Sequence, residues 1–189
     1  MGRWEPDARG RLMKAALELY GEHGFEQTTV AQIAERAGLT ERTFFRYFAD
    51  KREVLFAGAD VLQERMVSAA ADAPAGTTPI EAAAAGIEAA GTLIQEGGGL
   101  PRQRQSIIAA SVELQERELI KLASLAARLA EVLRGRGVSE PEASLAAEAA
   151  LAAFKIGFDR WVSSDGGRDL PQVIRDSLDA LKAVSAGQA

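Results

Sequence analysis

Apolar side chains recur at intervals of three and four residues along most of the chain, the spacing of a helix that buries one side. The first such stripe holds Leu12, Ala15, Ala16 and Leu19. No segment shows the period of two that a half-buried strand requires. The pattern predicts an all-α fold with about nine helices, at 8–22, between 29 and 38, from 40, and at 51–71, 79–96, 101–116, 117–136, 140–163 and from 169.

Two of the short predicted helices carry signals at their ends. Thr29 followed by Gln32 has the spacing of a capping box, in which the hydroxyl and the amide satisfy free backbone N–H groups. Gly38 stands where a chain leaving that helix takes the left-handed conformation, and Thr40 is placed to cap the next helix. A helix, a glycine turn and a second helix in this order predict a helix-turn-helix, whose second helix enters the major groove of DNA.

The helix opened by Thr40 has two sides of different chemistry. Phe44 and Phe48 are four residues apart and lie on one side, whereas Arg42, Phe45 and Arg46 share the other. Arginine can fork onto the edge of a guanine, and hydroxyl groups can hold phosphates. The alternative is a surface helix that happens to carry arginines.

Residues 9–56 closely resemble the DNA-binding domain of TetR-family transcriptional regulators. The resemblance is carried by Ala-Leu-Glu-Leu-Tyr-Gly-Glu-His-Gly-Phe, Thr-Thr-Val-Ala-Gln-Ile-Ala-Glu-Arg-Ala-Gly and Thr-Phe-Phe-Arg-Tyr-Phe-Ala-Asp-Lys. It implies that the DNA-binding residues are Thr29, Ala31, Gln32, Thr40, Glu41, Arg42, Thr43, Phe45, Arg46, Tyr47 and Lys51. Among them, we expect Arg42 and Arg46 to contact bases, and Thr43, Tyr47 and Lys51 to contact phosphates.

Two of these positions depart from the family pattern. Phe45 stands where tyrosine is usual, which removes a hydroxyl contact and favours packing on a thymine methyl group. Glu41 stands where lysine is common; it could accept from a cytosine amine or only support the helix dipole.

The resemblance also implies a domain organisation and a function. We expect a flexible arm at 1–8, the DNA-binding domain at 9–56 and a ligand-binding and dimerisation domain at 57–189. The implied protein is a repressor that binds a palindromic operator in double-stranded DNA as a homodimer and is released by a small hydrophobic effector. An all-α protein-interaction module without operator binding is the alternative.

Charge makes DNA binding a local property of this chain. The net charge is −5, and residues 1–56 are neutral, with nine Lys/Arg and nine Asp/Glu. Binding would therefore rest on a patch rather than on bulk charge. The patch expected from the sequence consists of Arg3, Arg9, Arg11, Arg42, Arg46, Lys51 and Arg52.

The residues needed for catalysis are missing from the sequence. Cysteine is absent and His23 is the single histidine, which leaves no thiol nucleophile and no spacing typical of a metal site. Gly97–Gly99 has neither a preceding strand nor a following Lys-Ser/Thr, so it does not fit a phosphate loop. We therefore expect no enzyme and no cofactor, and the lack of cysteine, signal peptide and membrane span favours a cytoplasmic protein.

The apolar stripes of the helices between 51 and 163 are expected to converge, either as a packed core or as the wall of an effector pocket. The small residues of 79–96 and Gly97–Gly99 supply little volume, which favours the pocket. The helix 51–71 would link this pocket to the DNA-binding domain. The residues expected to line the pocket are Leu62, Arg65, Met66, Leu93, Ile94, Arg104, Gln105, Ile108, Ser111, Val112, Leu122, Leu125, Phe154 and Phe158.

The predicted helix 140–163 is apolar on two sides. Leu151, Phe154, Phe158 and Trp161 form one stripe, and the other holds Leu145, Ala149, Ala152 and Ile156. A helix with two apolar sides needs two partners, and we expect one of them to be a second copy of the chain. The expected interface residues are Ala149, Ala152, Ile156, Trp161, Ile174, Leu178 and Leu181.

Overall fold

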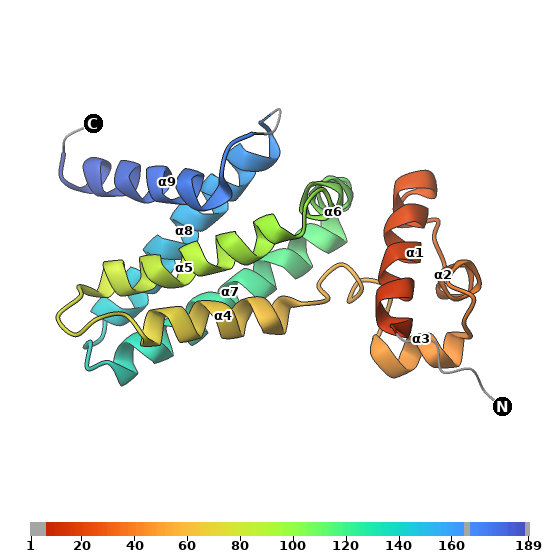
Figure 1. The fold of residues 1–189 in the computed structure, drawn as a ribbon, viewed down its shortest axis with the longest axis horizontal. Coiled ribbons are helices and arrows are strands. Elements are labelled where there is room, and N and C mark those ends of the chain that lie inside the picture. The colour runs from red at the N-terminus through yellow and green to blue at the C-terminus, as the bar shows by residue number, and fades with distance from the viewer. Residues whose placement is uncertain (1–6, 165–166, 188–189) are drawn as a thin grey trace. The chain divides into compact units, whose positions relative to one another are not determined.

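The computed structural model describes residues 7–164 and 167–187. Over these residues the chain forms nine helices and no strand, which confirms the all-α prediction (Figure 1). The helices are α1 (Ala8–His23), α2 (Val30–Arg36), α3 (Glu41–Tyr47), α4 (Ala59–Ala71), α5 (Pro79–Glu96), α6 (Leu100–Ala109), α7 (Val112–Gly135), α8 (Glu142–Val162) and α9 (Leu170–Ser185).

The chain packs as two compact units. The N-terminal unit is Met1–Gly58 with Arg102–Glu116, and the C-terminal unit is Ala59–Pro101 with Arg117–Ala189. Most of α6 and the first turn of α7 therefore pack with the N-terminal helices. The boundary expected near residue 56 between the two domains stays a prediction. The two compact units are not continuous in the chain, because residues 102–116 pack with the N-terminal helices.

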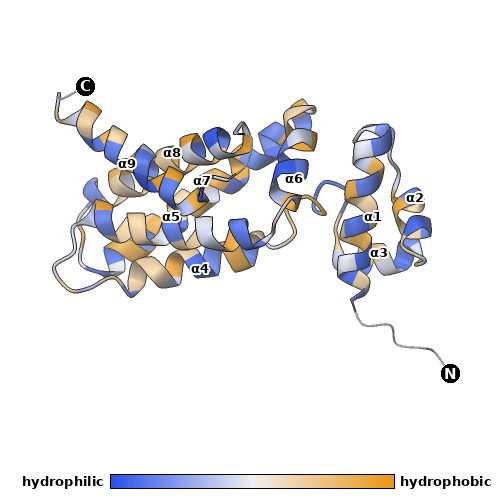
Figure 2. Cartoon of the chain, turned by 45° about the horizontal axis from the view of Figure 1, so that its top comes forward, coloured by the Kyte–Doolittle hydropathy of each residue, from blue (hydrophilic) through white to orange (hydrophobic). Residues whose placement is uncertain are grey.

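The core of the N-terminal unit is built by α1, α2, α3 and α6. Leu12, Ile33, Phe44 and Ile108 are fully enclosed in it. Phe25 lies edge-on to Tyr20, with ring centres 5.4 Å apart, and closes the end of α1. Both units bury one side of each amphipathic helix, and Figure 2 shows hydrophobic and hydrophilic residues along the same helices.

The predicted helix 51–71 is wrong at its start, because the helix begins at Ala59. Residues 51–58 form tight turns, in which Leu55 N–H donates to the Arg52 carbonyl at 3.0 Å and Phe56 N–H donates to that of Glu53 at 3.2 Å. The consecutive residues Val54, Leu55 and Phe56 are all buried. One side of an α-helix cannot bury three successive side chains, since each is turned by about 100° from the last. The continuous helix expected to link the DNA-binding domain to the effector pocket is therefore absent.

The break between the sixth and seventh helices is also earlier than predicted. It falls at 110–111, where the Ala110 and Ser111 N–H groups bond to the carbonyls of Ile107 and Ile108. The carbonyl of the buried Ser111 then accepts from Gln115 N–H at 3.0 Å and opens α7. Val112, expected to line the effector pocket, is 72% exposed, and Leu119 on α7 is 54% exposed.

Helix α5 is packed against α4, α8 and α9 (Figure 1). Its small residues allow this close approach. A Cβ atom on Gly86 would lie 2.8 Å from the Met66 carbonyl oxygen of α4. On α8, a Cβ on Gly157 would lie 3.0 Å from the Ile174 Cα of α9. Among the described residues, no helix combines the length and apolar character needed to span a bilayer.

Candidate nucleic-acid interface

The predicted capping box at the start of α2 is present. Thr29 Oγ1 accepts from Gln32 N–H at 3.2 Å, and Thr29 N–H donates to Gln32 Oε1 at 2.8 Å. These bonds fix both side chains while leaving them, and Ala31, exposed. The Gln32 amide nitrogen is the atom of this group best placed to donate outward.

Helix α3 begins as predicted and presents two distinct sides. Thr40 Oγ1 accepts from Thr43 N–H at 3.2 Å, and the hydroxyls of Thr40 and Thr43 are 3.1 Å apart. Phe44 and Phe48 are buried, with ring centres 5.5 Å apart. Phe45 packs edge-on against Phe44 yet is 54% exposed. The buried pair anchors the helix, so its other side is held outward on a rigid base.

The outward side of α3 carries two exposed guanidinium groups. Arg42 is exposed near the start of the helix and Arg46 near its end. The Arg46 guanidinium lies 4.9 Å from the centre of the Tyr47 ring and donates to the Tyr47 hydroxyl at 3.1 Å. Because the tyrosine oxygen accepts this bond, its own O–H remains able to donate to another acceptor. Glu41 is also exposed on this side.

Three members of the predicted basic patch are used inside the N-terminal unit. The Arg11 guanidinium bonds to the Ala37 carbonyl, next to Gly38, whose φ of 65° confirms the expected left-handed turn. Arg52 bonds to Asp50 Oδ2 at 2.5 Å and to Glu113 at 2.8 Å. Lys51 Nζ bonds to three backbone carbonyls. No local sequence signal indicates these roles of Arg11 and Lys51, because their partners lie more than 20 residues away.

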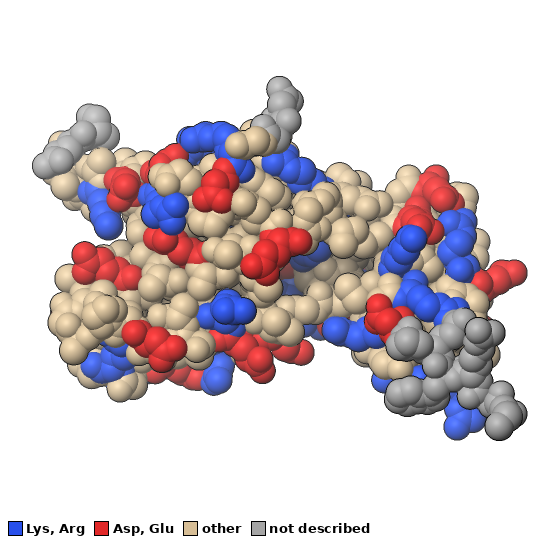
Figure 3. Space-filling model, viewed as in Figure 1, with Lys and Arg blue, Asp and Glu red and all other residues tan. Residues whose placement is uncertain are grey.

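The remaining patch is small. Arg9 lies 5.8 Å from the Phe48 ring centre, and Arg3 is outside the described residues. Basic and acidic side chains are interspersed on the face shown in Figure 3. Among the described members of the predicted patch, Arg9, Arg42 and Arg46 are thus the exposed ones.

Asp50 follows α3 and is held ionised by its neighbours. Its side chain accepts from the backbone N–H groups of Arg52 at 2.8 Å and Glu53 at 3.2 Å. The hydrogen bond from the Arg52 guanidinium is the main reason why the pKa of Asp50 lies below its usual value. Asp50 thus caps the residues that follow it, although it opens turns rather than a helix.

The residues predicted to line an effector pocket do not belong to one unit. Five of the fourteen are in the N-terminal unit: Arg104, Gln105, Ile108, Ser111 and Val112. Nine are in the C-terminal unit: Leu62, Arg65, Met66, Leu93, Ile94, Leu122, Leu125, Phe154 and Phe158. Arg104 donates to the Leu55 carbonyl at 2.5 Å and lies 5.0 Å from the Phe56 ring centre. Its guanidinium group therefore packs within the N-terminal unit.

The small residues of α5 leave no space between it and the neighbouring helices, contrary to the expectation from the sequence. Ala83, Ile87 and Ala90 on α5 are enclosed, and Gly86 and Gly91 bring neighbouring helices into contact. An open hollow of about 500 Å³ lies elsewhere, lined by Ala73, Ala75, Gly76, Thr77, Pro79, Arg136 and Val138. A second, of about 220 Å³, lies beside Arg11 and Arg36. The pocket itself stays a prediction.

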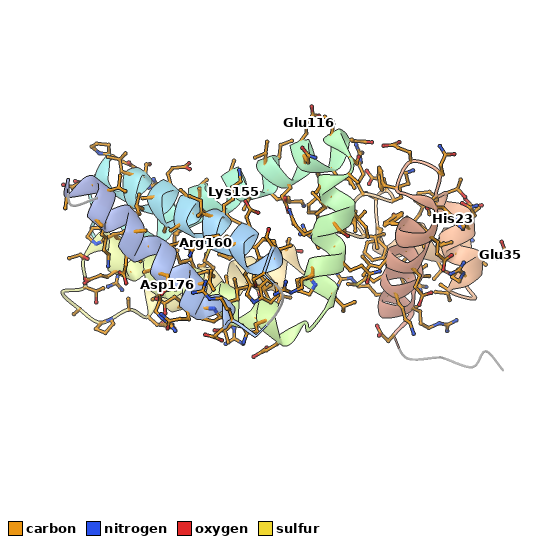
Figure 4. The ribbon with its side chains drawn as sticks, turned by 90° about the horizontal axis from the view of Figure 1, so that it is seen from above. His23, Glu35, Glu116, Lys155, Arg160 and Asp176 are labelled. Atoms are coloured by element: carbon orange, nitrogen blue, oxygen red, sulfur yellow. The ribbon has the colours of Figure 1, made fainter. Side chains whose placement is uncertain are left out.

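The predicted dimer residues fall into two groups. Trp161, Ile174 and Leu178 are buried in the core of the single chain, so the structure removes them from the dimer face. Gly157 explains this, because it lets α9 pack directly on α8. Ala152 and Ile156 are exposed, while Ala149 and Leu181 are half-buried. Figure 4 shows Arg160 of α8 and Asp176 of α9 on these neighbouring helices.

The described part of the chain offers no candidate metal centre. The described residues include no cluster of His, Asp and Glu able to hold a metal ion. His23 lies exposed at the end of α1, with its Nε2 3.7 Å from Glu22 (Figure 4).

Two family models match the chain. Residues 12–57 match the bacterial regulatory proteins of the tetR family, and residues 77–186 match the MftR C-terminal domain. The first match covers the helix-turn-helix with its caps and α3. The second covers more than half of the chain.

Relatives and solved structures agree with these matches. The chain is 31% identical over 134 residues to the transcriptional regulator TcmR of Streptomyces glaucescens, covering 68% of this chain and 59% of TcmR. The chain thus spans about three fifths of this relative. The structure of SmeT with triclosan has a TM-score of 0.66 at 21% identity, covering 94% of this chain and 90% of SmeT.

The structure of Thermus thermophilus FadR with lauroyl-CoA has a TM-score of 0.52 at 23% identity, covering 92% of this chain and 93% of FadR. At these identities the two structures show the shared fold. The proteins named are regulators rather than enzymes, as predicted. With its helix-turn-helix, its all-α fold and a family match over more than half its length, the chain belongs to the TetR family of DNA-binding transcriptional regulators.

Proposed function

We propose that the protein is a repressor that reads a palindromic operator through α3. The observation that carries this proposal is the exposed pair Arg42 and Arg46 on a helix anchored by Phe44 and Phe48. A guanidinium can donate two parallel hydrogen bonds to the O6 and N7 atoms of guanine in the major groove. Phe45 offers an apolar surface for a thymine methyl group beside them.

Phosphate contacts are assigned to uncharged groups in this proposal. The Tyr47 hydroxyl can donate because Arg46 occupies its acceptor side. Thr29, Gln32, Thr40 and Thr43 add polar groups at the starts of α2 and α3. Since few charges contact the backbone, the affinity should depend less steeply on salt than in a protein with a broad basic surface.

We propose a homodimer through the exposed apolar stripe of α8, which holds Leu145, Ala149, Ala152 and Ile156. Leu145 and Ile156 are 65% and 55% exposed in the single chain. The opposite side of α8 is already buried by α5 and α9, so a second partner is left for this stripe. A two-fold axis would set the two α3 helices about 34 Å apart, one turn of DNA.

Release by a small hydrophobic effector is the regulatory part of the proposal. It is supported by two proteins of similar fold whose structures contain such molecules, SmeT with triclosan and FadR with lauroyl-CoA. Because α5 is closely packed, an effector that binds beside it requires a conformation in which helices of the C-terminal unit have separated. It can shift the equilibrium only if it prefers that conformation.

Selection from random duplex DNA tests operator reading. The expected result is an enriched palindrome whose half-sites lie about one helical turn apart. Recovery of no enriched palindrome by the wild-type protein would refute the proposal and favour a protein-interaction module.

Light scattering of Ile156→Glu tests the dimer. The wild type should be a dimer at micromolar concentration, and the variant a folded monomer, because the charge would be buried unpaired only in the dimer. Leu119→Glu is a matched control, since Leu119 is 54% exposed on α7, outside the proposed face. A monomeric wild type would contradict the proposed dimer.

A further inference from the structure

The open hollow of about 500 Å³ lies between two loops of the C-terminal unit. One loop joins α4 to α5 and the other joins α7 to α8, and Figure 1 shows both at the same end of that unit. The lining residues are Ala73, Ala75, Gly76, Thr77, Pro79, Arg136 and Val138. None of them belongs to the effector pocket expected from the sequence, so the hollow is a separate place on the molecule.

Arg136 is the charged residue of this lining, and backbone oxygens hold its guanidinium group. Its Nη1 donates to the carbonyls of Ala71 at 2.7 Å and Ala73 at 2.8 Å, and its Nη2 donates to that of Pro74 at 3.0 Å. Ala71 is the last residue of α4, so its carbonyl has no partner within the helix and is satisfied from outside. The three bonds fix the half-buried side chain in the wall of the hollow.

The charge of Arg136 has no counter-ion in the part of the chain that the structure describes. Its bonds there are the three to carbonyl oxygens. The acidic residues on either side of the α4–α5 loop are engaged with hydroxyl and amide groups. Asp72 Oδ2 accepts from Ser68 Oγ at 3.2 Å, and Glu81 Oε2 accepts from Thr78 N–H at 3.0 Å. A fixed positive charge beside a hollow with no acidic lining residue favours an anion there.

We propose that the hollow binds a small carboxylate that carries an apolar group. A guanidinium group has five N–H donors, and the three carbonyl bonds account for both donors of Nη1 and one of Nη2. The donors left on the neighbouring nitrogens Nε and Nη2 match the two oxygens of a carboxylate. The apolar part of the ligand would lie on Ala73, Pro79 and Val138.

The size and the chemistry of the hollow favour this class of ligand. Its volume is in the range of small-molecule sites, which combine apolar walls with a few polar groups that fix orientation. Inorganic phosphate is the competing anion, but it has more acceptor oxygens than two donors can satisfy and no apolar group to cover the wall. The inference goes beyond the proposed function, because it needs neither an operator nor a second copy of the chain.

The test titrates benzoate into the full chain and follows the amide NMR signals of the two loops. Benzamide keeps the ring without the charge, and inorganic phosphate keeps the charge without the ring. Arg136→Met removes the guanidinium group, whereas Thr77→Trp fills the hollow and keeps it. Arg134→Met is the matched control, since Arg134 is exposed, pairs with Glu140 and does not line the hollow.

The wild type should bind benzoate with a Kd of about 1 mM, and benzamide and phosphate about tenfold more weakly. Arg136→Met should weaken benzoate binding about tenfold because the carboxylate loses both donors. Thr77→Trp should weaken it by a similar factor because the ring has no room, and Arg134→Met should leave it unchanged.

Four results would overturn the proposal. The first is the absence of a saturable shift in the wild type. Equal binding of benzamide would exclude recognition of the charge, and tighter binding of phosphate would exclude the carboxylate class. Wild-type affinity for benzoate in Thr77→Trp would place the ligand outside the hollow. If Arg136→Met does not fold, since it also loses the bonds to the end of α4, the two comparison ligands and Thr77→Trp still decide the outcome.

Discussion

Helices α3 and α5 use side-chain size in opposite ways. Helix α3 holds large residues on both sides: Phe44 and Phe48 are enclosed, and Arg42, Phe45 and Arg46 face outward. Helix α5 places its smallest residues where the packing is tightest, with Ala83 and Gly86 against neighbouring helices. The outward side chains of α3 offer groups that can bind a partner, whereas the small residues of α5 allow the neighbouring helices to approach closely.

A run of small residues on a helix can therefore be interpreted in two ways. Small residues on a helix are compatible with a vacant space or with close helix contact, and periodicity does not separate the two. On α5 the neighbours decide the matter, because the Met66 carbonyl of α4 occupies the position where a side chain of residue 86 would begin. Whether small residues leave vacant space can therefore be judged only when the helices packed against them are known.

The largest expected effect is at Ala90, which is 2% exposed on α5. Ala90→Phe adds a ring to a closely packed core and should lower the free energy of unfolding by about 3 kcal/mol. Urea unfolding measures this, and Thr92→Phe on the exposed side of α5 is the matched control, expected to change stability by about 0.5 kcal/mol or less. Wild-type stability in Ala90→Phe would show that α5 borders a vacant space after all.

The corresponding change on α3 should affect binding and leave folding intact. Arg42→Ala and Arg46→Ala should each cost about 2 kcal/mol of operator affinity and relax one base position, because each removes a two-pronged base contact. Titration of the selected duplex and its single-base variants provides the measurement. Arg128→Ala on α7 is the control for charge, since Arg128 pairs with Glu131 in the C-terminal unit. Uniform weakening on every duplex would assign the arginines to phosphate instead.

A smaller effect should distinguish Arg46 from Arg42. The Arg46 guanidinium packs on Tyr47 and bonds to its hydroxyl. A double-mutant cycle with Arg46→Ala and Tyr47→Phe should give a coupling of about 0.5–1 kcal/mol in operator binding. The cycle of Arg42→Ala with Tyr47→Phe serves as the reference and should be close to additive. Additivity in both cycles would mean that the Arg46–Tyr47 contact does not persist on DNA.

The smallest expected effect is the pH dependence of the turn after α3. The Arg52 hydrogen bond lowers the pKa of Asp50 in the folded state. Such a group stabilises the fold above its unfolded pKa of about 4, and this stability is lost as the pH falls through the folded value. Asp50→Asn should therefore melt below the wild type at pH 7, and the two should converge under acid conditions. A difference in melting temperature that persists at low pH would assign the effect to lost backbone capping rather than to charge.

Much of the helix-turn-helix could be predicted because its sequence signals are local. Thr29 with Gln32, Gly38 and Thr40 act on backbone groups within four residues, so their pattern is readable without a structure. The two sides of α3 follow from the helical period. The start of α4 could not be predicted in this way, because the cap at Asp50 is compatible with a helix and with the turns observed.

Helix α8 shows where periodicity stops being informative. The two apolar stripes of α8 are visible in the sequence, and one of them is buried while the other is exposed. The position of Trp161 and Ile174 inside the single chain follows from Gly157, which brings α9 against α8. That contact joins helices whose pairing no local pattern specifies.

The sequence by itself determined the all-α class, the caps of α2 and α3, the family and the outward side of α3, since each depends on residues that are neighbours along the chain. The tertiary structure decided which charged side chains are held by bonds within the chain. Arg11, Lys51 and Arg52 look equivalent to Arg42 and Arg46 in the sequence, yet their charged groups bond to Ala37, to the turn 25–28, and to Asp50 and Glu113. Most of these partners are distant in the chain, and only folding brings a carbonyl or carboxylate within bonding distance of these charged groups.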